Sequence, residues 1–417
     1  MDYINMAAKA VQGTQDPVAT EQEKALRDAN DFDAWEAIMP ALTSRFDCSL
    51  ADRLSSYLGR RNPFYREVDP KKHSVWVFDN TAYRPSDNPK AWQAEFVAAY
   101  FVKGSGKDLS AIAADIAEKI GLGSGDAAEA LIAERLRPFV DQILPAHSVD
   151  IDIGDKQMKR LGPSCRDGIS SDVVRLNSLF PPGSIITTST PALAPETPAP
   201  VTIFAEPEGW AIVSDVDDTI KKTLTSSPLG ILKTTFAEEP EPIAGMPELY
   251  RYLKNFLQNP PFFYLSASPY NLYPFLRRFR QEYYPPGTLI LREASWMNLA
   301  GFLSSLTRGT EAYKVDRLQK IHGWFPQRKM ICIGDSTQTD PESYAEAYRR
   351  FPGWIKGIYI RKVEGVSEIA VDGEKKNSEQ RFEKAFRDVP RHVWHVFEDP
   401  RELYAKVEGL VKTVNGK

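Results

Sequence analysis

Cysteine, histidine and long apolar runs are all scarce in this chain of 417 residues, which holds three cysteines and five histidines. Cys48, Cys165 and Cys332 are widely spaced and odd in number, so they form neither a disulfide framework nor a zinc-ligand pattern. We therefore expect a reducing, intracellular setting. No apolar run approaches the roughly 20 residues that a membrane helix needs, and the opening residues lack the apolar core of a secretion signal. A secreted or membrane-spanning protein is not expected, whereas peripheral membrane contact needs only a surface patch.

An excess of either charge is also missing. The chain has 52 basic and 56 acidic residues, which gives a formal net charge of −4. A dedicated nucleic-acid binder carries a strongly basic surface, so we do not expect nucleic acid as a partner. Apolar residues make up 42% and charged residues 26%, as in ordinary globular proteins. At about 150 residues per domain, the length predicts two or three folded domains.

The distribution of apolar residues divides the chain into four parts. Residues 1–66 are predicted to be a helical N-terminal extension, because apolar residues recur at helical spacing between Thr20 and Arg61. Residues 67–180 contain short β-rich runs and two helix-like stretches, which predict a β-rich, sandwich-like α+β accessory domain. A Pro-rich linker is predicted over 181–205 from a set of prolines among small residues, namely Pro181, Pro182, Pro191, Pro195, Pro198 and Pro200.

The remaining part, 206–417, alternates short apolar strands with helices. The predicted strands are Trp210–Ser214, Phe262–Leu265, Thr288–Leu291, Met330–Ile333, Ile358–Ile360 and His395–Glu398. This alternation predicts an α/β domain with a parallel sheet that helices cover on both faces. Ligands of open parallel sheets bind at the carboxyl ends of the strands, so we expect the chemistry in the residues that directly follow these runs.

Two of these places carry candidate catalytic groups in the first half of the domain. Asp215 and Asp217 follow the first strand, and two carboxylates at this spacing allow one to attack an electrophile while the other manages the leaving group's proton. The alternative interpretation is an acidic helix-capping loop. Ser266 follows the second strand, where a hydroxyl and turn amides hold phosphate oxygens or where a serine simply caps a helix.

Two further places lie later in the chain. Lys314 begins a helical pattern and can stabilise negative charge on a transferred phosphoryl group, although a lone lysine is usually solvated. Asp335 and Asp340 follow the strand Met330–Ile333, and Gly334 before them permits a sharp turn. Asp340 precedes a proline and is also a candidate helix N-cap.

Four carboxylates near one sheet edge require a cation. Unit charges about 4 Å apart at an effective dielectric near 20 repel by roughly 4 kcal/mol. With no histidine or cysteine in these strings, oxygen ligands favour Mg²⁺ over zinc.

The order of these strings resembles the four motifs of the haloacid dehalogenase superfamily of phosphohydrolases. More narrowly, Asp215–Lys221, Tyr264–Pro269 and Ile333–Ser336 resemble the actin-patch phosphatidate phosphatase family of fungi. The resemblance extends from about Trp210 to Arg361, with weaker similarity in 75–84. It implies a Rossmann-like catalytic domain of haloacid dehalogenase type.

The resemblance also implies a role for each matching residue. Asp215 corresponds to the nucleophile that forms an aspartyl-phosphate intermediate, and Asp217 to the general acid and base. Thr219 corresponds to a supporting hydroxyl of the same loop. Ser266, with its neighbour Ala267, corresponds to the phosphate-binding turn.

Lys314 corresponds to the residue that steadies the nucleophile and the phosphoryl charge. Asp335 corresponds to the acidic metal ligand, and Asp340 to a second or water-mediated one. The implied Mg²⁺ site therefore consists of Asp215, Asp217 through its carbonyl, Asp335 and Asp340.

The resemblance implies a Mg²⁺-dependent phosphatase that converts phosphatidate to diacylglycerol and phosphate. Two alternatives stay open: a phosphatase of the same fold that acts on a soluble phosphomonoester or phosphoprotein, and a membrane-cortex adaptor in which catalysis is secondary. The family further implies a cytoplasmic protein that binds the phospholipid membrane surface at cortical actin patches, with SH3-containing endocytic or actin-patch partners.

A segment just after the first motif mixes apolar and basic residues, which suits an anionic lipid surface. The alternative is that this segment packs on the sheet. The residues predicted to contact a membrane are Lys221, Lys222, Leu229, Ile231, Leu232, Lys233 and Phe236.

Overall fold

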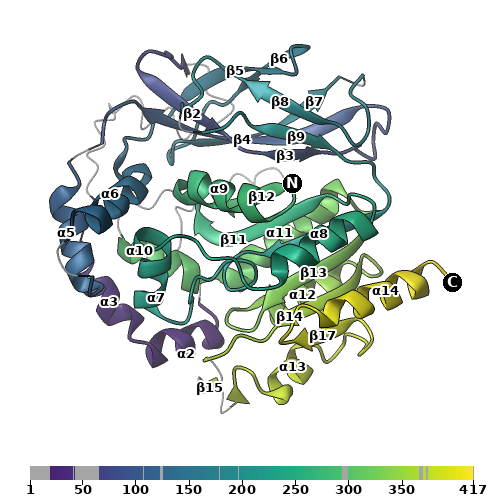
Figure 1. The fold of residues 1–417 in the computed structure, drawn as a ribbon. Coiled ribbons are helices and arrows are strands. Elements are labelled where there is room, and N and C mark those ends of the chain that lie inside the picture. The colour runs from purple at the N-terminus through teal and green to yellow at the C-terminus, as the bar shows by residue number, and fades with distance from the viewer. Residues whose placement is uncertain are drawn as a thin grey trace, which may run out of the picture.

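The protein is described by a computed structural model that covers residues 19–40, 42, 65–106, 108–122, 125–177, 179–195, 197–293, 299–365, 370–371 and 374–416. In this part of the chain, two β-sheets lie above a parallel sheet with its helices (Figure 1).

The parallel sheet contains six strands in the order β12-β11-β10-β13-β14-β17. Their bounds are β10 Trp210–Asp215, β11 Phe262–Pro269, β12 Thr288–Arg292, β13 Lys329–Asp335, β14 Ile355–Arg361 and β17 Trp394–Phe397. Every neighbouring pair is parallel, so the predicted α/β architecture is confirmed for this region. The chain proceeds outward from β10 in one direction through β11 and β12, and in the other direction through β13. This reversal marks the position where ligands of such sheets bind.

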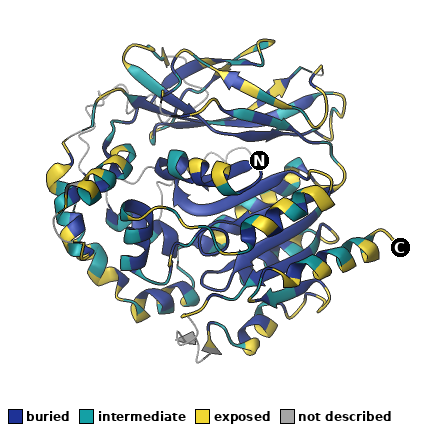
Figure 2. Cartoon of the chain, in the orientation of Figure 1, coloured by how far each residue is buried: buried dark blue, intermediate teal, exposed yellow. Residues whose placement is uncertain are grey.

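Alternation along β10 determines which helices cover each face of the sheet. Ile212 points into a core with α8 Met246–Phe256, α9 Tyr273–Tyr283 and α14 Glu402–Val414. Ala211 and Val213 point to the other face and pack with α11 Thr310–Trp324, α12 Asp340–Arg350 and α13 Glu379–Ala385. The central strands are buried on both sides, as the dark ribbon in Figure 2 shows. Such strands read as continuous apolar runs, which is why the sequence predicts them.

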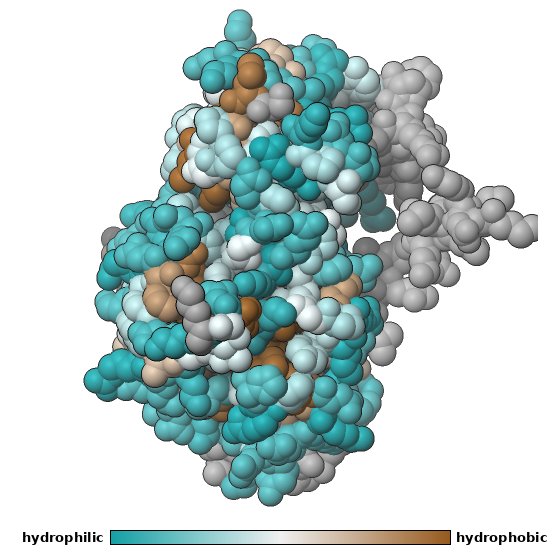
Figure 3. Space-filling model, turned by 90° about the vertical axis from the view of Figure 1, so that its right-hand side faces the viewer, coloured by the Kyte–Doolittle hydropathy of each residue, from teal (hydrophilic) through white to brown (hydrophobic). Residues whose placement is uncertain are grey.

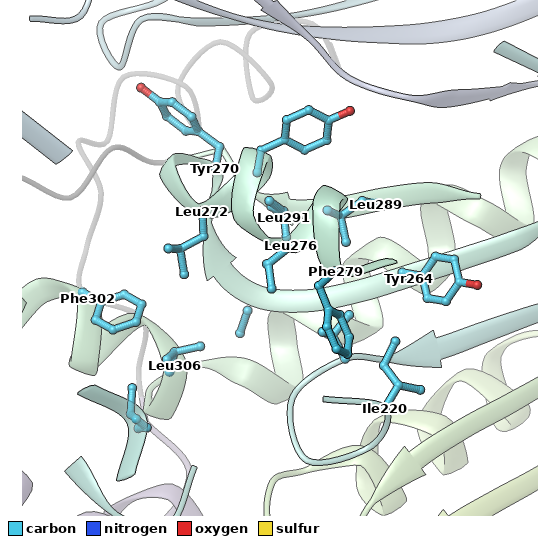
Figure 4. Close-up of a cluster of buried hydrophobic side chains, with 14 of the residues drawn as sticks. Ile220, Tyr264, Tyr270, Leu272, Leu276, Phe279, Leu289, Leu291, Phe302 and Leu306 are labelled. Atoms are coloured by element: carbon cyan, nitrogen blue, oxygen red, sulfur yellow. The ribbon is translucent and has the colours of Figure 1, made fainter. Parts of the chain in front are cut away.

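The first of these cores extends to the helices at the carboxyl edge of the sheet. Figure 4 shows Tyr264 and Phe279 beside Ile220, with Phe302 and Leu306 of α10 Leu299–Thr307 further along the same cluster. These side chains are all buried. The cluster therefore holds α10 and the loop after β10 against the sheet.

Two packed sheets form the region before residue 206. A three-stranded antiparallel sheet contains β2 His73–Val77, β4 Trp92–Val102 and β7 Ile169–Leu176. The second sheet contains β1 Arg66–Glu67, β5 His147–Ile153, β6 Gln157–Leu161, β8 Ile185–Ser189, β9 Val201–Phe204 and β3 Asn80–Ala82. Apolar residues of both sheets share one core, among them Val75, Phe96 and Ile151.

The stretch 181–205, for which the proline content predicts a linker, differs from that prediction. It contains β8 and β9, which pair with each other and with β5 and β3. Its prolines fall outside the two strands, where the missing backbone N–H costs no ladder hydrogen bond. The segment is therefore part of the second sheet. The other predicted boundaries, at residues 66 and 180, stay predictions.

Helices also precede and follow the first strands. The predicted N-terminal helical extension contains α2 Glu21–Ala29 and α3 Phe32–Ile38, and most of its other residues lie outside the described part of the chain. After β4 come α5 Ser110–Lys119 and α6 Asp126–Val140. Figure 1 shows α2, α3, α5 and α6 on the same side of the molecule as α10.

A buried ion cluster joins the two-sheet region to the parallel sheet. Asp79, between β2 and β3, accepts hydrogen bonds from Arg277 Nε and Nη2 at 2.8 Å each and from Arg280 Nη2 at 2.5 Å. All three residues are buried. Beside them, the ring of Phe78 stacks on that of Tyr273, with the ring centroids 3.7 Å apart. Helix α9 is thus fixed to the sheet above it.

Among the described residues, no helix has the length and apolar character to cross a membrane. The face of the molecule shown in Figure 3 is largely hydrophilic, with small separate apolar areas.

Candidate active site

Strand register brings the first two motifs together. Asp215 is the last residue of β10 and pairs with Leu265 of β11, so Ser266 is the next residue on the neighbouring strand. On the other side, Ser214 pairs with Ile333 of β13, which ends at Asp335. Three adjacent strands, β11, β10 and β13, therefore carry Ser266, Asp215 and Asp335 toward their carboxyl ends.

Lys314 lies against Asp215. Its Nζ is 2.7 Å from Asp215 Oδ1, contacts Asp340 Oδ1 closely and donates a hydrogen bond to Gln338 Oε1 at 3.2 Å. The hydroxyl of Thr219 donates to the other oxygen of Asp215, Oδ2, at 3.1 Å. The side chain of Lys314 is completely buried, so the interpretation as a solvated lysine is wrong.

Asp217 lies at the same edge with different partners. Ser266 Oγ donates to Asp217 Oδ2 at 2.6 Å, and Thr223 Oγ1 donates to Asp217 Oδ1 at 2.9 Å. The backbone N–H of Ser268 donates to Ser266 Oγ at 3.0 Å, which fixes the serine hydroxyl at the turn. The two carboxylates of the first motif thus differ: one contacts a lysine, the other two hydroxyl groups.

Asp340 folds back on the strand that precedes it. The backbone N–H of Asp335 donates to Asp340 Oδ2 at 3.0 Å. An added Cβ at Gly334 would lie 2.6 Å from the same oxygen, so this close approach requires glycine. The N-cap of α12 is Thr339, and Asp340 is the first helical residue. The prediction of an N-cap at Asp340 is therefore wrong by one position, because its carboxylate is directed toward Lys314 and Asp335.

Burial determines the charge state of these groups. Burial and the neighbouring Asp340 raise the pKa of Asp215 well above its usual range, and the same causes raise the pKa of Asp335 to about 7. Burial also disfavours the charged form of Lys314, but the carboxylates of Asp215, Asp340 and Asp335 outweigh it, so the pKa of Lys314 is raised. The ammonium group of Lys314 therefore stays charged. Its single positive charge does not balance the negative charges of the three carboxylates around it.

A metal ion would supply the missing charge. Asp215, Asp335 and Asp340 each offer a carboxylate oxygen, and these oxygens lie within 4.8 Å of one another. All three residues are buried, and one lysine can neutralise only one of them. An all-oxygen donor set suits a hard divalent cation. The buried cluster can therefore hold a metal ion, with the Asp217 carboxylate bound instead to Ser266 and Thr223.

Comparison with known proteins finds a family model that is similar to the part of the chain that holds the site. Residues 210–362 match the family model described as the catalytic domain of phosphatidate phosphatase APP1. We call this matched stretch, residues 210–362, the APP1-type region. All of the motif residues described above lie inside the APP1-type region.

Two relatives extend the match. Phosphatidate phosphatase APP1 of Saccharomyces cerevisiae is 28% identical over 244 residues, which cover 56% of this chain and 41% of the yeast protein. An uncharacterized protein of Schizosaccharomyces pombe is 31% identical over 160 residues, covering 37% of this chain and 25% of that protein. The match thus spans less than half the length of each relative. Among solved structures, a carbohydrate esterase chain aligns at 8% identity with a TM-score of 0.19, a similarity too low to indicate a shared fold.

Two residues at the site have roles that the sequence motifs do not assign. Asp218 accepts hydrogen bonds from the backbone N–H groups of Thr223 and Thr225 at 2.9 and 2.7 Å, which shapes the loop after β10. Lys376, in the polar stretch after β14, is buried and donates to the carbonyl of Thr337 at 3.0 Å. Burial lowers the pKa of Lys376 to about 7. The first motif contains Asp218 without indicating its role, and the polar stretch around Lys376 gives no sign of its burial, so both roles follow only from the tertiary structure.

The segment predicted to contact a membrane forms α7 Pro228–Leu232 and η2 Lys233–Ala237. The structure corrects the prediction for Lys221, Ile231, Leu232 and Phe236, because these side chains are buried. Apolar composition alone does not distinguish a helix that packs on the protein from one that lies on lipid. Here the rings of Phe139 on α6 and Phe302 on α10 surround that of Phe236, with ring centroids 5.7 and 5.3 Å away.

The basic residues of that segment behave in two ways. Lys221 is buried, donates to Thr223 Oγ1 at 3.1 Å and faces Asp217, and burial lowers its pKa. Lys222 and Lys233 are only partly buried, as is Leu229, and Lys222 pairs with Glu241 at 2.9 Å. Membrane contact through Lys222, Lys233 and Leu229 stays a prediction.

Proposed function

We propose that this protein is a Mg²⁺-dependent phosphatidate phosphatase of haloacid dehalogenase type, which hydrolyses phosphatidate to diacylglycerol and phosphate. The observation that supports this most directly is the match of residues 210–362 to the APP1 catalytic domain, combined with the buried cluster of Asp215, Lys314, Asp335 and Asp340 inside it. The Saccharomyces cerevisiae relative is named a phosphatidate phosphatase.

Asp215 is the proposed nucleophile. Thr219 and Lys314 hold its two carboxylate oxygens from different sides, so the side chain is oriented before substrate binds. One oxygen attacks phosphorus and forms an aspartyl-phosphate, while the ester oxygen of the lipid leaves. Lys314 then balances the negative charge that develops on the phosphoryl oxygens.

Asp217 is the proposed general acid and base. It protonates the leaving oxygen, and afterwards accepts a proton from the water that hydrolyses the aspartyl-phosphate. Its hydrogen bonds with Ser266 and Thr223 fix the direction of both carboxylate oxygens. Ser266 is also the proposed ligand of a phosphate oxygen, together with the turn amide at Ala267.

Mg²⁺ fits the donor set of Asp215, Asp335 and Asp340, where it would neutralise the phosphate and allow an anionic nucleophile to approach. The main-chain carbonyl of Asp217 is a further proposed ligand. Asp340 also pairs with Lys314, so its own contact with the metal is proposed to run through water.

The test is phosphate release from vesicles that contain phosphatidate, with Mg²⁺ or with a chelator. We expect the intact chain to release phosphate only with Mg²⁺, and the variants Asp215→Asn and Asp217→Asn to lose that activity. Asp316→Asn is the matched control, because Asp316 is an exposed carboxylate on the helix that carries Lys314. Activity that persists in Asp215→Asn would contradict the proposed mechanism.

The same assay separates the alternatives. A phosphatase for soluble substrates would hydrolyse a soluble phosphomonoester or phosphoprotein and would release no phosphate from the vesicles. A membrane-cortex adaptor would keep its function in cells after Asp215→Asn. The phospholipid surface, SH3-containing partners and a cytoplasmic location at cortical actin patches are proposals of the same kind, and microscopy of a tagged chain beside the Asp215→Asn variant tests the location.

A further inference from the structure

The helix that carries Lys314 begins without a capping side chain of its own. The N-cap of α11 is Gly309, which has φ of +62° and no side chain to bind the first N–H groups. The first four N–H groups of any helix need an external partner. The start of α11 is buried, since Thr310 has only 1% of its surface exposed. A partner from elsewhere in the fold is therefore required.

Glu23 of α2 is that partner. Its Oε2 accepts a hydrogen bond from the backbone N–H of Gly309 at 2.8 Å, and its Oε1 accepts from Thr310 N–H at 2.7 Å and Thr310 Oγ1 at 2.6 Å. Its side chain is buried, so these bonds are shielded from water. A carboxylate at a helix N-terminus also interacts favourably with the helix dipole. Glu23 thus replaces the cap that Gly309 lacks.

A second buried charge anchors the same face of α2. Arg27 lies one turn after Glu23, and its Nη1 donates to Thr307 Oγ1 at the end of α10, 2.7 Å away. Glu23 and Arg27 therefore contact residues 307–310, where α10 ends and α11 begins. Figure 1 shows α2 at the side of the molecule where α10 lies.

The anchored turn leads directly to the catalytic groups. Lys314 follows Thr310 by four residues, so the two residues lie on the same face of α11 one turn apart. Thr310 Oγ1 also shares a hydrogen bond of 3.0 Å with Thr339 Oγ1, and Thr339 is the N-cap of α12 that precedes Asp340. A shift of the first turn of α11 would therefore move Lys314 relative to both Asp215 and Asp340.

We propose that Glu23 is a positioning residue for the reaction. Its carboxylate fixes the first turn of α11 and thereby places Lys314 Nζ against Asp215 and Asp340. Glu23 lies outside the APP1-type region, so part of the active-site scaffold comes from the N-terminal helices. This inference rests on the proposed function for its effect on turnover, but the anchoring of α11 can be measured independently.

The experiment compares Glu23→Ala and Glu23→Gln in the intact chain, with Mg²⁺ and a soluble short-chain phosphatidate. Displacement of a catalytic group by about 1 Å costs up to roughly 100-fold in rate. Because Asp215 and Asp340 still hold Lys314 directly, we expect kcat of Glu23→Ala to fall about tenfold with KM within about twofold. Glu23→Gln keeps the shape and one acceptor, so its kcat should fall between those of wild type and Glu23→Ala.

Two variants serve as controls. Thr20→Ala removes one half of the capping box at the start of α2, the bond from the Glu23 N–H to Thr20 Oγ1, yet leaves the Glu23 contacts with α11. Glu21→Gln removes an exposed charge from the same turn. Both should keep kcat within about twofold of wild type, and hydrogen exchange at the amides of Gly309 and Thr310 should accelerate only in the two Glu23 variants.

Each outcome decides the inference. Wild-type kcat in Glu23→Ala, or an equal loss in Thr20→Ala at the same folded fraction, would overturn it. If Glu23→Ala fails to fold, Glu23→Gln gives the decision by the same kcat comparison. If the wild-type chain hydrolyses no phosphate ester, the proposed function fails instead, and unchanged exchange at Gly309 and Thr310 would overturn the anchoring on its own.

Discussion

Removal of the Asp79 carboxylate should destabilise the junction between the two-sheet region and α9. The carboxylate of Asp79 accepts three hydrogen bonds from Arg277 and Arg280 and one from the backbone N–H of Val201, at 2.9 Å. In Asp79→Ala both guanidinium groups stay buried without their anion. Breaking a buried ion pair by removing one partner costs about 3 to 5 kcal/mol, and two cations here depend on the same anion. We therefore expect the upper part of this range.

The assay is urea unfolding of the intact chain, followed by fluorescence and by circular dichroism. Asp87→Ala is the matched control, because Asp87 is an exposed carboxylate 3.7 Å from Arg175, and such surface pairs contribute about 0 to 1 kcal/mol. A triple variant, Asp79→Leu with Arg277→Met and Arg280→Met, should recover much of the loss, since apolar replacement of a whole buried cluster is often nearly neutral. If Asp79→Ala loses no more stability than Asp87→Ala, the cluster does not join the two regions as argued.

Three other perturbations address the candidate site. Gly334→Ala places a Cβ 2.6 Å from Asp340 Oδ2 and should lower kcat roughly 100-fold, measured as phosphate release at unchanged circular dichroism; near-normal turnover would show that the loop tolerates a side chain. Ser266→Ala removes the hydrogen bond to Asp217 and should also lower kcat by roughly 100-fold, whereas Ser266→Thr should retain more activity. Without Mg²⁺, the free energy of unfolding should fall as the pH rises from about 4 to about 7. Burial raises the pKa of Asp335 to about 7, so over this range Asp335 keeps a proton in the folded chain that it has released in the unfolded chain. The melting temperature of Asp335→Asn minus that of wild type should therefore increase over this pH range, and Mg²⁺ should stabilise wild type more at pH 7 than at pH 5. A difference in melting temperature that stays constant with pH would show that protonation of Asp335 does not contribute to stability.

The sequence predicts the parallel sheet well because its central strands are buried on both faces. Such strands are runs of apolar residues, and three of the four motifs end or directly follow one of them, whereas Lys314 lies on α11. Strand register then determines which motifs meet, so Asp215, Ser266 and Asp335 come together as predicted. The positions of these groups follow from local pattern and one general rule of parallel sheets.

Contacts between distant segments account for what the sequence does not predict. Glu23 lies 287 residues from Thr310, and Asp79 lies 198 residues from Arg277; no local pattern links either pair. The burial of Phe236 depends on Phe139 and Phe302, which approach it only in the folded chain. Likewise, β8 and β9 lie between prolines that locally favour irregular structure.

The Asp79 cluster has a practical consequence for work with recombinant fragments. A fragment that starts at residue 206 would keep Arg277, Arg280 and Tyr273 but lose Asp79 and Phe78, which cover them in the intact chain. Both guanidinium groups and the ring of Tyr273 would then be exposed on one side of α9, and the contacts that fix this helix would be gone. Such a fragment should be less stable than the intact chain, so screening for inhibitors or crystals is best begun with a chain that includes the upstream sheets.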